Sequence, residues 1–87
     1  MTEKDVTISI PAGLTAKTVT VIVEKANSFS SSIVFESDHR RVNGKSLLGV
    51  LSLGIVKGTN ITLIADGSDE KEAVDALVSL IQNNFGE

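Results

Sequence analysis

Apolar and polar side chains alternate near the start of the chain and later recur at a helical spacing. Residues 6–10 alternate strictly, with apolar side chains at Val6, Ile8 and Ile10, which predicts a half-buried strand. The Pro-Ala-Gly turn at 11–13 ends this strand. The next apolar positions have the spacing of one helix face: Val19, Ile22, Val23 and Ala26. A helix therefore follows the turn, although its β-branched residues require tertiary packing to stabilise it.

The middle of the chain predicts a β-hairpin followed by a short helix. Residues 32–37 have the pattern of a strand, the polar turn at 37–40 reverses the chain, and residues 41–43 form a short return strand. Ser46 can cap a short helix that begins at Leu47, because a serine hydroxyl accepts a hydrogen bond from a free helix N–H group.

The last third of the chain predicts one further strand and one further helix. Residues 59–67 have apolar side chains at alternate positions, which favours a strand. Asp69 with Glu72 three residues later resembles a capping box at a helix start. The following apolar positions track one face of a helix: Ala73, Val74, Leu77, Leu80 and Ile81.

The predicted order of elements is β-α-β-β-α-β-α. Three helices on one face of a four-stranded antiparallel sheet make an open-faced two-layer sandwich of the α+β class. With 87 residues, the chain is expected to form a single domain spanning residues 1–87.

Composition narrows the possible functions. The chain has no cysteine, which excludes disulfides and thiolate metal sites, and its net charge of −3 argues against nucleic acid as a direct partner. No apolar stretch approaches the roughly 20 residues that span a bilayer. No secretory signal is visible either, so we expect a cytoplasmic protein without a membrane partner.

Few residues suggest chemistry. The glycine turn before the first predicted helix creates a helix N-terminus, where an anion can be held, but residues 13–18 contain no histidine, cysteine or carboxylate. His39 lies in the polar turn and is expected to be a surface histidine, with Arg40 and Arg41 as solvated charges. No metal site or cofactor motif is present, since the chain has no P-loop or dinucleotide fingerprint.

Several motifs, taken together with the order of elements and the length, resemble HPr, the histidine-containing phosphocarrier of the bacterial phosphotransferase system. They are Gly-Leu-x-Ala before the first helix, Lys-Ser-x-x-Gly-x-x-Ser-Leu at 45–53, and Lys-Gly at 57–58. The resemblance covers nearly the whole chain and is strongest from Val42 to Leu77. It implies the HPr fold, and the chain is closest in kind to Crh-type members, which lack the active-site histidine.

The family's first phosphorylation site is altered. Its pattern is G-[IL]-H-A-R-P, whereas residues 13–18 read Gly-Leu-Thr-Ala-Lys-Thr, with Thr15 at the histidine position. A threonine hydroxyl is a poor nucleophile without a neighbouring base, and a phosphothreonine ester is too stable to pass its phosphate on. We therefore expect no catalytic residue here: Thr15 caps the helix, and Lys17 is a surface charge or binds an anion.

The family's second phosphorylation site is intact. The resemblance implies that HPr kinase phosphorylates Ser46, preceded by Lys45, and that Leu47, Leu48 and Leu51 occupy the family's docking positions. Phosphate at this helix start would add a charge of about −1.5 to −2 without unfolding the protein. The leucines cannot all face inward from one short helix, so some of them should form an exposed apolar surface.

The resemblance implies a non-enzymatic regulator of carbon catabolite repression. Its expected partners are HPr kinase/phosphorylase and a LacI-type regulator such as catabolite control protein A. Two alternatives stay open: a drifted or engineered scaffold without a working switch, and a phosphocarrier that uses another residue. The sequence also leaves open a dimer that exchanges the first strand about the turn at 11–13.

Overall fold

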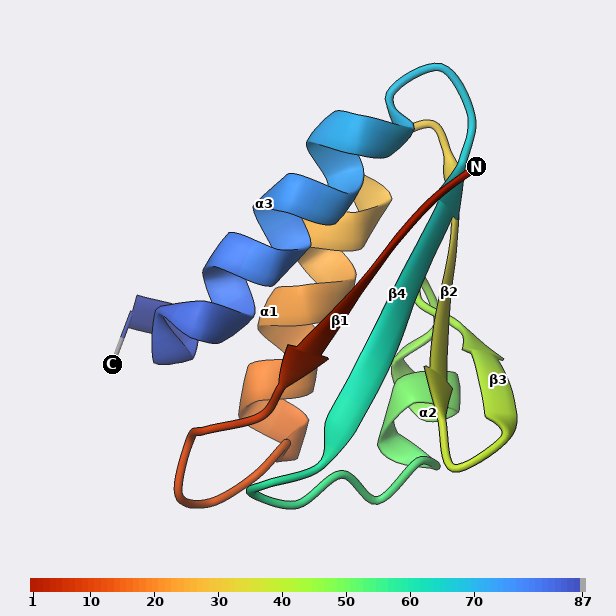
Figure 1. The fold of residues 1–87 in the computed structure, drawn as a ribbon. Coiled ribbons are helices and arrows are strands. Elements are labelled where there is room, and N and C mark those ends of the chain that lie inside the picture. Colours follow the sequence, from red (N-terminus) through yellow and green to blue (C-terminus); the bar gives the residue numbers. More distant parts are fainter. Residues whose placement is uncertain (87) are drawn as a thin grey trace.

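Four antiparallel strands form one sheet in the order β1-β4-β2-β3, as the computed structural model shows (Figure 1). The structure describes residues 1–86. The strands are β1 (Thr2–Thr7), β2 (Ser32–Ser37), β3 (Arg40–Asn43) and β4 (Asn60–Asp66). β3 and β1 are the two edge strands.

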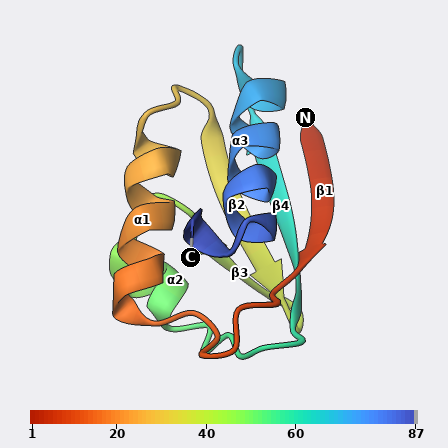
Figure 2. The ribbon, with the colours of Figure 1, turned by 90° about the vertical axis from the view of Figure 1, so that its left-hand side faces the viewer.

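Three α-helices cover one face of this sheet and leave the other face open (Figures 1 and 2). They are α1 (Ala16–Asn27), α2 (Leu47–Leu51) and α3 (Glu70–Gln82), and a 3-10 turn, η1 (Asn84–Gly86), follows α3. In Figure 2, α1 and α3 lie side by side in front of the sheet, and α2 lies next to the first turns of α1. The predicted α+β sandwich and its βαββαβα order are confirmed.

The core lies between the sheet and the helices. It is built from the alternate strand residues and the helical stripes that the sequence pattern singles out, with Phe35 and Leu63 fully buried in the sheet and Val19 and Leu77 fully buried in the helices. Burying each such side chain contributes about 1.5–3 kcal/mol. This packing offsets the low helix propensity of the β-branched residues in α1.

The loop before α1 is pressed against the loop that follows α2. Gly13 has a φ of +68°, and a Cβ there would lie only 2.7 Å from the carbonyl oxygen of Ile55. The Leu14 N–H donates to the same oxygen at 3.0 Å. Glycine is thus required at position 13 for both conformation and space, and this contact places the N-terminus of α1 beside the loop at 55–57.

The first strand begins and ends earlier than predicted. The sequence pattern placed it at residues 6–10, whereas β1 covers Thr2–Thr7. Ile8 instead pairs with the loop before β4, where its N–H donates to the Thr59 carbonyl at 2.9 Å and its carbonyl accepts from the Gly58 N–H at 2.7 Å. The side chains of Ile8 and Ile10 are buried as expected, so the burial pattern was predicted better than the hydrogen-bonding pattern.

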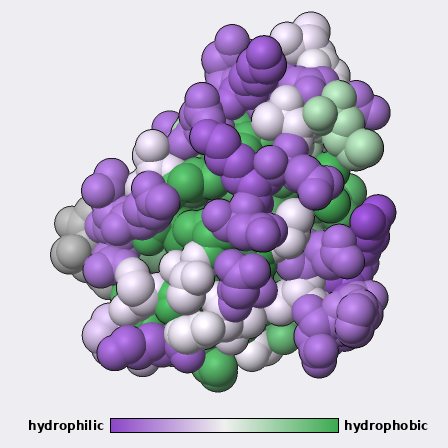
Figure 3. Space-filling view, viewed as in Figure 1, coloured by the Kyte–Doolittle hydropathy of each residue, from purple (hydrophilic) through white to green (hydrophobic). Residues whose placement is uncertain are grey.

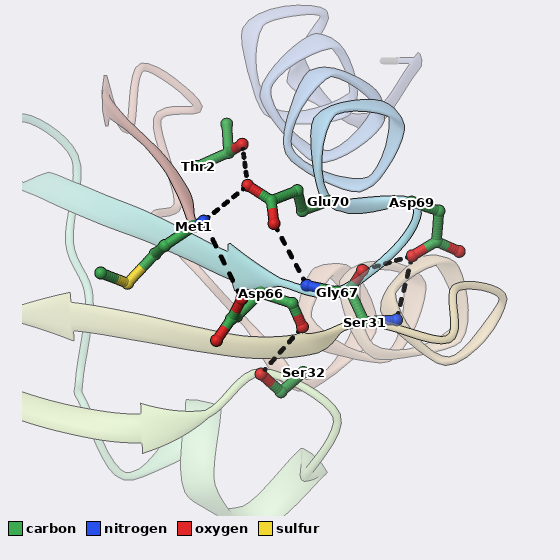
Figure 4. Close-up of polar contacts among 8 residues, drawn as sticks. All are labelled: Met1, Thr2, Ser31, Ser32, Asp66, Gly67, Asp69 and Glu70. Atoms are coloured by element: carbon green, nitrogen blue, oxygen red, sulfur yellow. Dashed lines mark hydrogen bonds and ion pairs between the residues drawn. The ribbon is translucent and has the colours of Figure 1, made fainter.

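The predicted capping box at Asp69 is wrong. Asp69 is the N-cap of α3, but its side chain makes no cap hydrogen bond. Its carboxylate accepts from the Ser30 backbone N–H at 2.9 Å. It also accepts from the Ser31 backbone N–H at 3.0 Å and from the Ser31 hydroxyl (Figure 4). The competing donors come from a loop almost 40 residues away in sequence, so no local pattern reveals them.

Candidate functional site

Thr15 is the N-cap of α1, as predicted. Its hydroxyl accepts from the Thr18 backbone N–H at 3.4 Å, and the Thr18 hydroxyl accepts from the Thr15 N–H at 2.9 Å. The two threonines therefore form a reciprocal capping box. Thr18 is buried, whereas Thr15 and Lys17 are exposed.

This arrangement stabilises a helix end and offers no means of activating the Thr15 hydroxyl. A general base must lie within hydrogen-bond reach of the proton that it removes. The groups that the structure places on the Thr15 oxygen are the backbone N–H and the hydroxyl of Thr18, and neither is a base. The contacts of Thr15 are thus those of a helix cap.

Ser46 is the N-cap of α2, also as predicted. It has extended backbone angles, and its hydroxyl oxygen accepts from the Gly49 N–H at 3.1 Å. The residue is half-buried, and no acidic side chain lies in the first turn of α2. A phosphate on this oxygen would therefore meet free helix N–H groups without a neighbouring carboxylate in that turn.

Gly49 leaves the space around the Ser46 hydroxyl open. It belongs to the motif at 45–53, but no structural role was predicted for it from the sequence. A Cβ at position 49 would lie 3.2 Å from the Ser46 oxygen and 3.5 Å from the Asn43 carbonyl. Glycine is unfavourable inside a helix. A glycine three residues after a cap serine could therefore have indicated that space is needed at the serine hydroxyl.

The leucines of α2 divide between surface and core. Leu48 is 79% exposed and Leu47 is 41% exposed, whereas Val50 is buried. Leu51 is half-buried and packs against the core. We call Leu47 and Leu48 the leucine patch. It adjoins Ser46 directly in the chain, whereas Leu51 belongs mainly to the packed side of α2.

Lys45 is fixed away from the start of α2. Its ammonium donates to the Phe29 carbonyl at 2.7 Å, just beyond the end of α1. The Lys45 carbonyl accepts from the Asn27 side-chain amide at 3.2 Å, and that amide also donates to the Val23 carbonyl. The end of α1 therefore holds the residue that precedes Ser46.

The two arginines of β3 have different partners. The Arg40 guanidinium donates to the Ser52 carbonyl at 2.8 Å, which ties the hairpin to the end of α2. Arg41 pairs with Glu36 through its Nε atom at 3.3 Å. Arg40 was expected to be only a solvated charge, and its contact with Ser52 corrects that expectation. His39 is exposed in the hairpin turn, at a φ of +65°.

The strongest electrostatic shifts lie at the start of α3, and none of them involves Thr15 or Ser46. Hydrogen bonds from Ser31 and Ser30 lower the pKa of Asp69 from 3.8 to about 2. Hydrogen bonds from Thr2 and the N-terminal ammonium lower the pKa of Glu70 from 4.5 to about 2 (Figure 4). Glu70 also accepts from the Gly67 N–H, so these carboxylates connect the N-terminus, α3 and the loop before β2.

No helix in residues 1–86 is long and apolar enough to cross a membrane. The same residues contain no group of three or more histidine, aspartate or glutamate side chains arranged to hold a metal ion. The chemistry available at positions 15 and 46 is therefore that of two hydroxyl groups and the surfaces around them.

Residues 2–83 match the family described as "PTS HPr component phosphorylation site". The chain is 44% identical over 82 residues to the HPr-like protein Crh of Halalkalibacterium halodurans, which covers 94% of this chain and 98% of that protein. It is also 40% identical to the phosphocarrier protein HPr of Cupriavidus necator, over all of this chain and 98% of that protein.

The fold agrees closely with a solved structure of the same kind. The crystal structure of HPr-C-His from Thermoanaerobacter tengcongensis superposes with a TM-score of 0.97 at 44% sequence identity. The match covers 100% of this chain and 98% of that one. The similarity thus extends over the sheet, all three helices and both sites.

Proposed function

Because this chain belongs to the HPr family, we propose that it is a cytoplasmic regulatory docking protein switched by phosphorylation of Ser46. HPr kinase/phosphorylase adds and removes the phosphate. The phosphorylated form docks on a LacI-type catabolite control regulator through the leucine patch. The chain itself does not relay phosphate, because a threonine stands at the position of the reactive histidine.

One observation carries this proposal: the Ser46 hydroxyl lies at the open start of α2, directly before Leu47 and Leu48. A phosphate there places negative charge beside an exposed apolar surface, which is the combination that a partner with cationic and apolar groups recognises. Lys45 is held by Phe29, so the added charge is available to a partner.

The similarity to Crh supports the same assignment. The chain is 44% identical to a protein named HPr-like protein Crh, and the length is almost fully shared. A Thr15 that is engaged in a capping box fits a family member that has kept the helix start and lost the transfer chemistry.

A phosphocarrier is the second candidate, and the 40% identity to HPr of Cupriavidus necator favours it. This candidate requires a nucleophile that both accepts and releases phosphate near neutral pH. Thr15 is unsuited because alkyl phosphate esters are stable. His39 lies in the turn between β2 and β3 and not at the N-terminus of α1, where the family pattern places the reactive histidine. The regulatory assignment therefore explains more of the structure.

The test is incubation with HPr kinase and ATP, followed by intact mass measurement and localisation of the modified residue. We expect a gain of one phosphate on Ser46 and no gain in Ser46→Ala. Thr15→Ala is the matched control, since it removes the other hydroxyl N-cap and should keep the full mass gain. Absence of any gain would favour a scaffold without a switch.

A second arm separates the phosphocarrier. The protein is incubated with phosphoenolpyruvate and Enzyme I, with an authentic HPr as positive control. We expect no phosphate on this chain under conditions that fully load the control. Transfer to any residue would support the phosphocarrier and contradict the proposed function.

A further inference from the structure

The structure assigns a second binding site, distinct from the leucine patch: we propose that an open cavity on the helix-free face of β2 and β3, called the β2–β3 cavity, binds a small organic anion. The cavity has a volume of about 510 Å³. It is lined by residues 32–34 of β2, residues 41–43 of β3, and Lys45. Pockets for small molecules usually measure about 300–1,000 Å³, so the size suits one such ligand.

The walls of this β2–β3 cavity combine aliphatic surface with polar groups. Val34 and Asn43 are register partners and lie on the same face of the sheet. Since Ile33 and Phe35 are in the core, Val34 and Asn43 lie on the face away from the helices. That face is the one left open in Figure 1, so a ligand can enter without displacing a helix.

Both ionisable groups in the lining are cations. They are Arg41 and Lys45, and no acidic side chain belongs to the lining among the described residues. The positive charge of these lining side chains contrasts with the net charge of −3 of the whole chain. An anionic ligand with an apolar body is therefore the chemical class that complements the cavity.

Each cation has one partner in the structure and keeps further donors. Arg41 contacts Glu36 through Nε at 3.3 Å, and a guanidinium carries four further N–H donors. Lys45 gives one hydrogen bond to the Phe29 carbonyl, and an ammonium has three donors.

Lys45 is the last residue of the β2–β3 cavity lining and directly precedes Ser46 in the chain. The inference does not depend on Ser46 being phosphorylated, because it concerns the geometry of the unmodified chain. It can therefore be tested, and can fail, independently of the proposed function.

The experiment is a titration of the full ¹⁵N-labelled chain, followed by amide chemical shifts. 1-Naphthyl phosphate and 1-naphthoate serve as anionic probes, 1-naphthol as the neutral body, and inorganic phosphate as the head group alone. We expect saturable shifts at residues 32–34 and 41–45 with at least one anionic probe. Affinity for 1-naphthol and for phosphate should be at least about tenfold weaker than for the anionic naphthyl probe. The reason is that 1-naphthol lacks the anionic group and phosphate lacks the apolar body.

Arg41→Gln and Arg40→Gln make a matched pair, since both remove one charge from the same short strand. Arg40 contacts Ser52 and does not line the cavity. We expect Arg41→Gln to weaken the anionic probe by about five- to tenfold, and Arg40→Gln to change its affinity by less than about twofold. Arg41 is exposed, so the substitution should leave the fold intact.

Several results would overturn the inference. They are the absence of saturable shifts with both anionic probes, equal affinity for 1-naphthol, and equal effects of the two arginine substitutions. Shifts that run along the outer edge of β3 and spare residues 32–34 would indicate an added peptide strand, which would also contradict a small-molecule site.

Discussion

Thr15 and Ser46 have the same local role and different surroundings. Both are hydroxyl N-caps that accept a hydrogen bond from the N–H three residues later. Thr15 is also contacted by a second hydroxyl, that of Thr18, in a reciprocal box. Ser46 faces a glycine at the equivalent position. Position 15 therefore has a second hydroxyl contact, whereas the hydroxyl at position 46 accepts one cap hydrogen bond, from the Gly49 N–H.

Gly49 should control how readily Ser46 is phosphorylated. In Gly49→Ala the new methyl group lies 3.2 Å from the Ser46 oxygen, which crowds the attacking hydroxyl. The rate of phosphorylation by HPr kinase should fall several-fold. The free energy of unfolding should change little, because the gain of up to about 1 kcal/mol in helix propensity offsets the cost of this crowding. Leu48→Ala is the control, because it places no new methyl group near the Ser46 oxygen. If Leu48→Ala lowered the phosphorylation rate as much as Gly49→Ala does, this role of Gly49 would be contradicted.

Asp69 and Glu70 should make the fold sensitive to acid. Their pKa values are lowered to about 2 by hydrogen bonds to the carboxylates, so these bonds stabilise the folded state above the ordinary carboxyl pKa. Stability is then lost as the pH falls from about 4 towards 2. Urea unfolding measured across this range checks the sign.

Asp69→Asn provides the control for that pH dependence. An amide does not titrate, so the variant should be less stable near neutral pH and should lose less stability between about pH 4 and 2. The slope should not vanish, because Glu70 still titrates. An acid slope in Asp69→Asn equal to that of the unmodified chain would show that Asp69 contributes nothing to it.

At the scale of elements, α2 is the helix on which the proposed function depends. It is only five residues long and contains two exposed leucines and one buried valine, and the cap serine Ser46 directly precedes it. Arg40 holds its end at Ser52, and Asn27 holds the residue before its cap. The surrounding elements thus fix α2 firmly enough to present Leu47 and Leu48 to a partner.

Leu48→Ala should weaken binding of the regulator by about tenfold or more, because an exposed anchor at an interface contributes at least about 1.4 kcal/mol. Val21→Ala is the matched control: Val21 is another exposed aliphatic residue, 37% accessible, and it lies on α1. Both substitutions should alter stability by less than about 0.5 kcal/mol. Equal binding losses in the two variants would place the interface elsewhere.

The periodicity of the sequence predicted α1, α3, β2 and β4, whereas α2 was predicted from its cap serine and β3 from the turn before it. The strand pattern of 32–37 and the helical stripes of α1 and α3 were confirmed because they reflect burial, which sets both patterns. The β1 boundaries were wrong because main-chain pairing of Ile8 with the loop at 58–59 leaves no trace in side-chain pattern. Asp69 was misread because its partners, Ser30 and Ser31, are distant in sequence.

The candidate site was predictable only in part. The two caps followed from local chemistry, and the structure confirmed both. The roles of Ser46 and of the leucine positions came from the resemblance to HPr and stay predictions. The β2–β3 cavity could not be predicted, because its residues come together only through strand pairing and the turn at Lys45.

At the scale of the whole molecule, the faces differ in character. The face formed by β1 and α3 is mostly hydrophilic, with hydrophobic side chains showing only in small separate areas (Figure 3). Leu47 and Leu48 belong to α2, which packs on α1 and β3 instead. The fold therefore separates a mostly hydrophilic face around β1 and α3 from the leucine patch beside Ser46.

The central claim is that phosphate on Ser46 switches docking. Calorimetric titration of the phosphorylated and unphosphorylated chains against a LacI-type catabolite control regulator tests it most directly. The phosphorylated form should bind at least about tenfold more tightly, because each charge-assisted hydrogen bond to the phosphate contributes about 1.5–3 kcal/mol. Equal affinity of the two forms, or binding of neither, would contradict the claim.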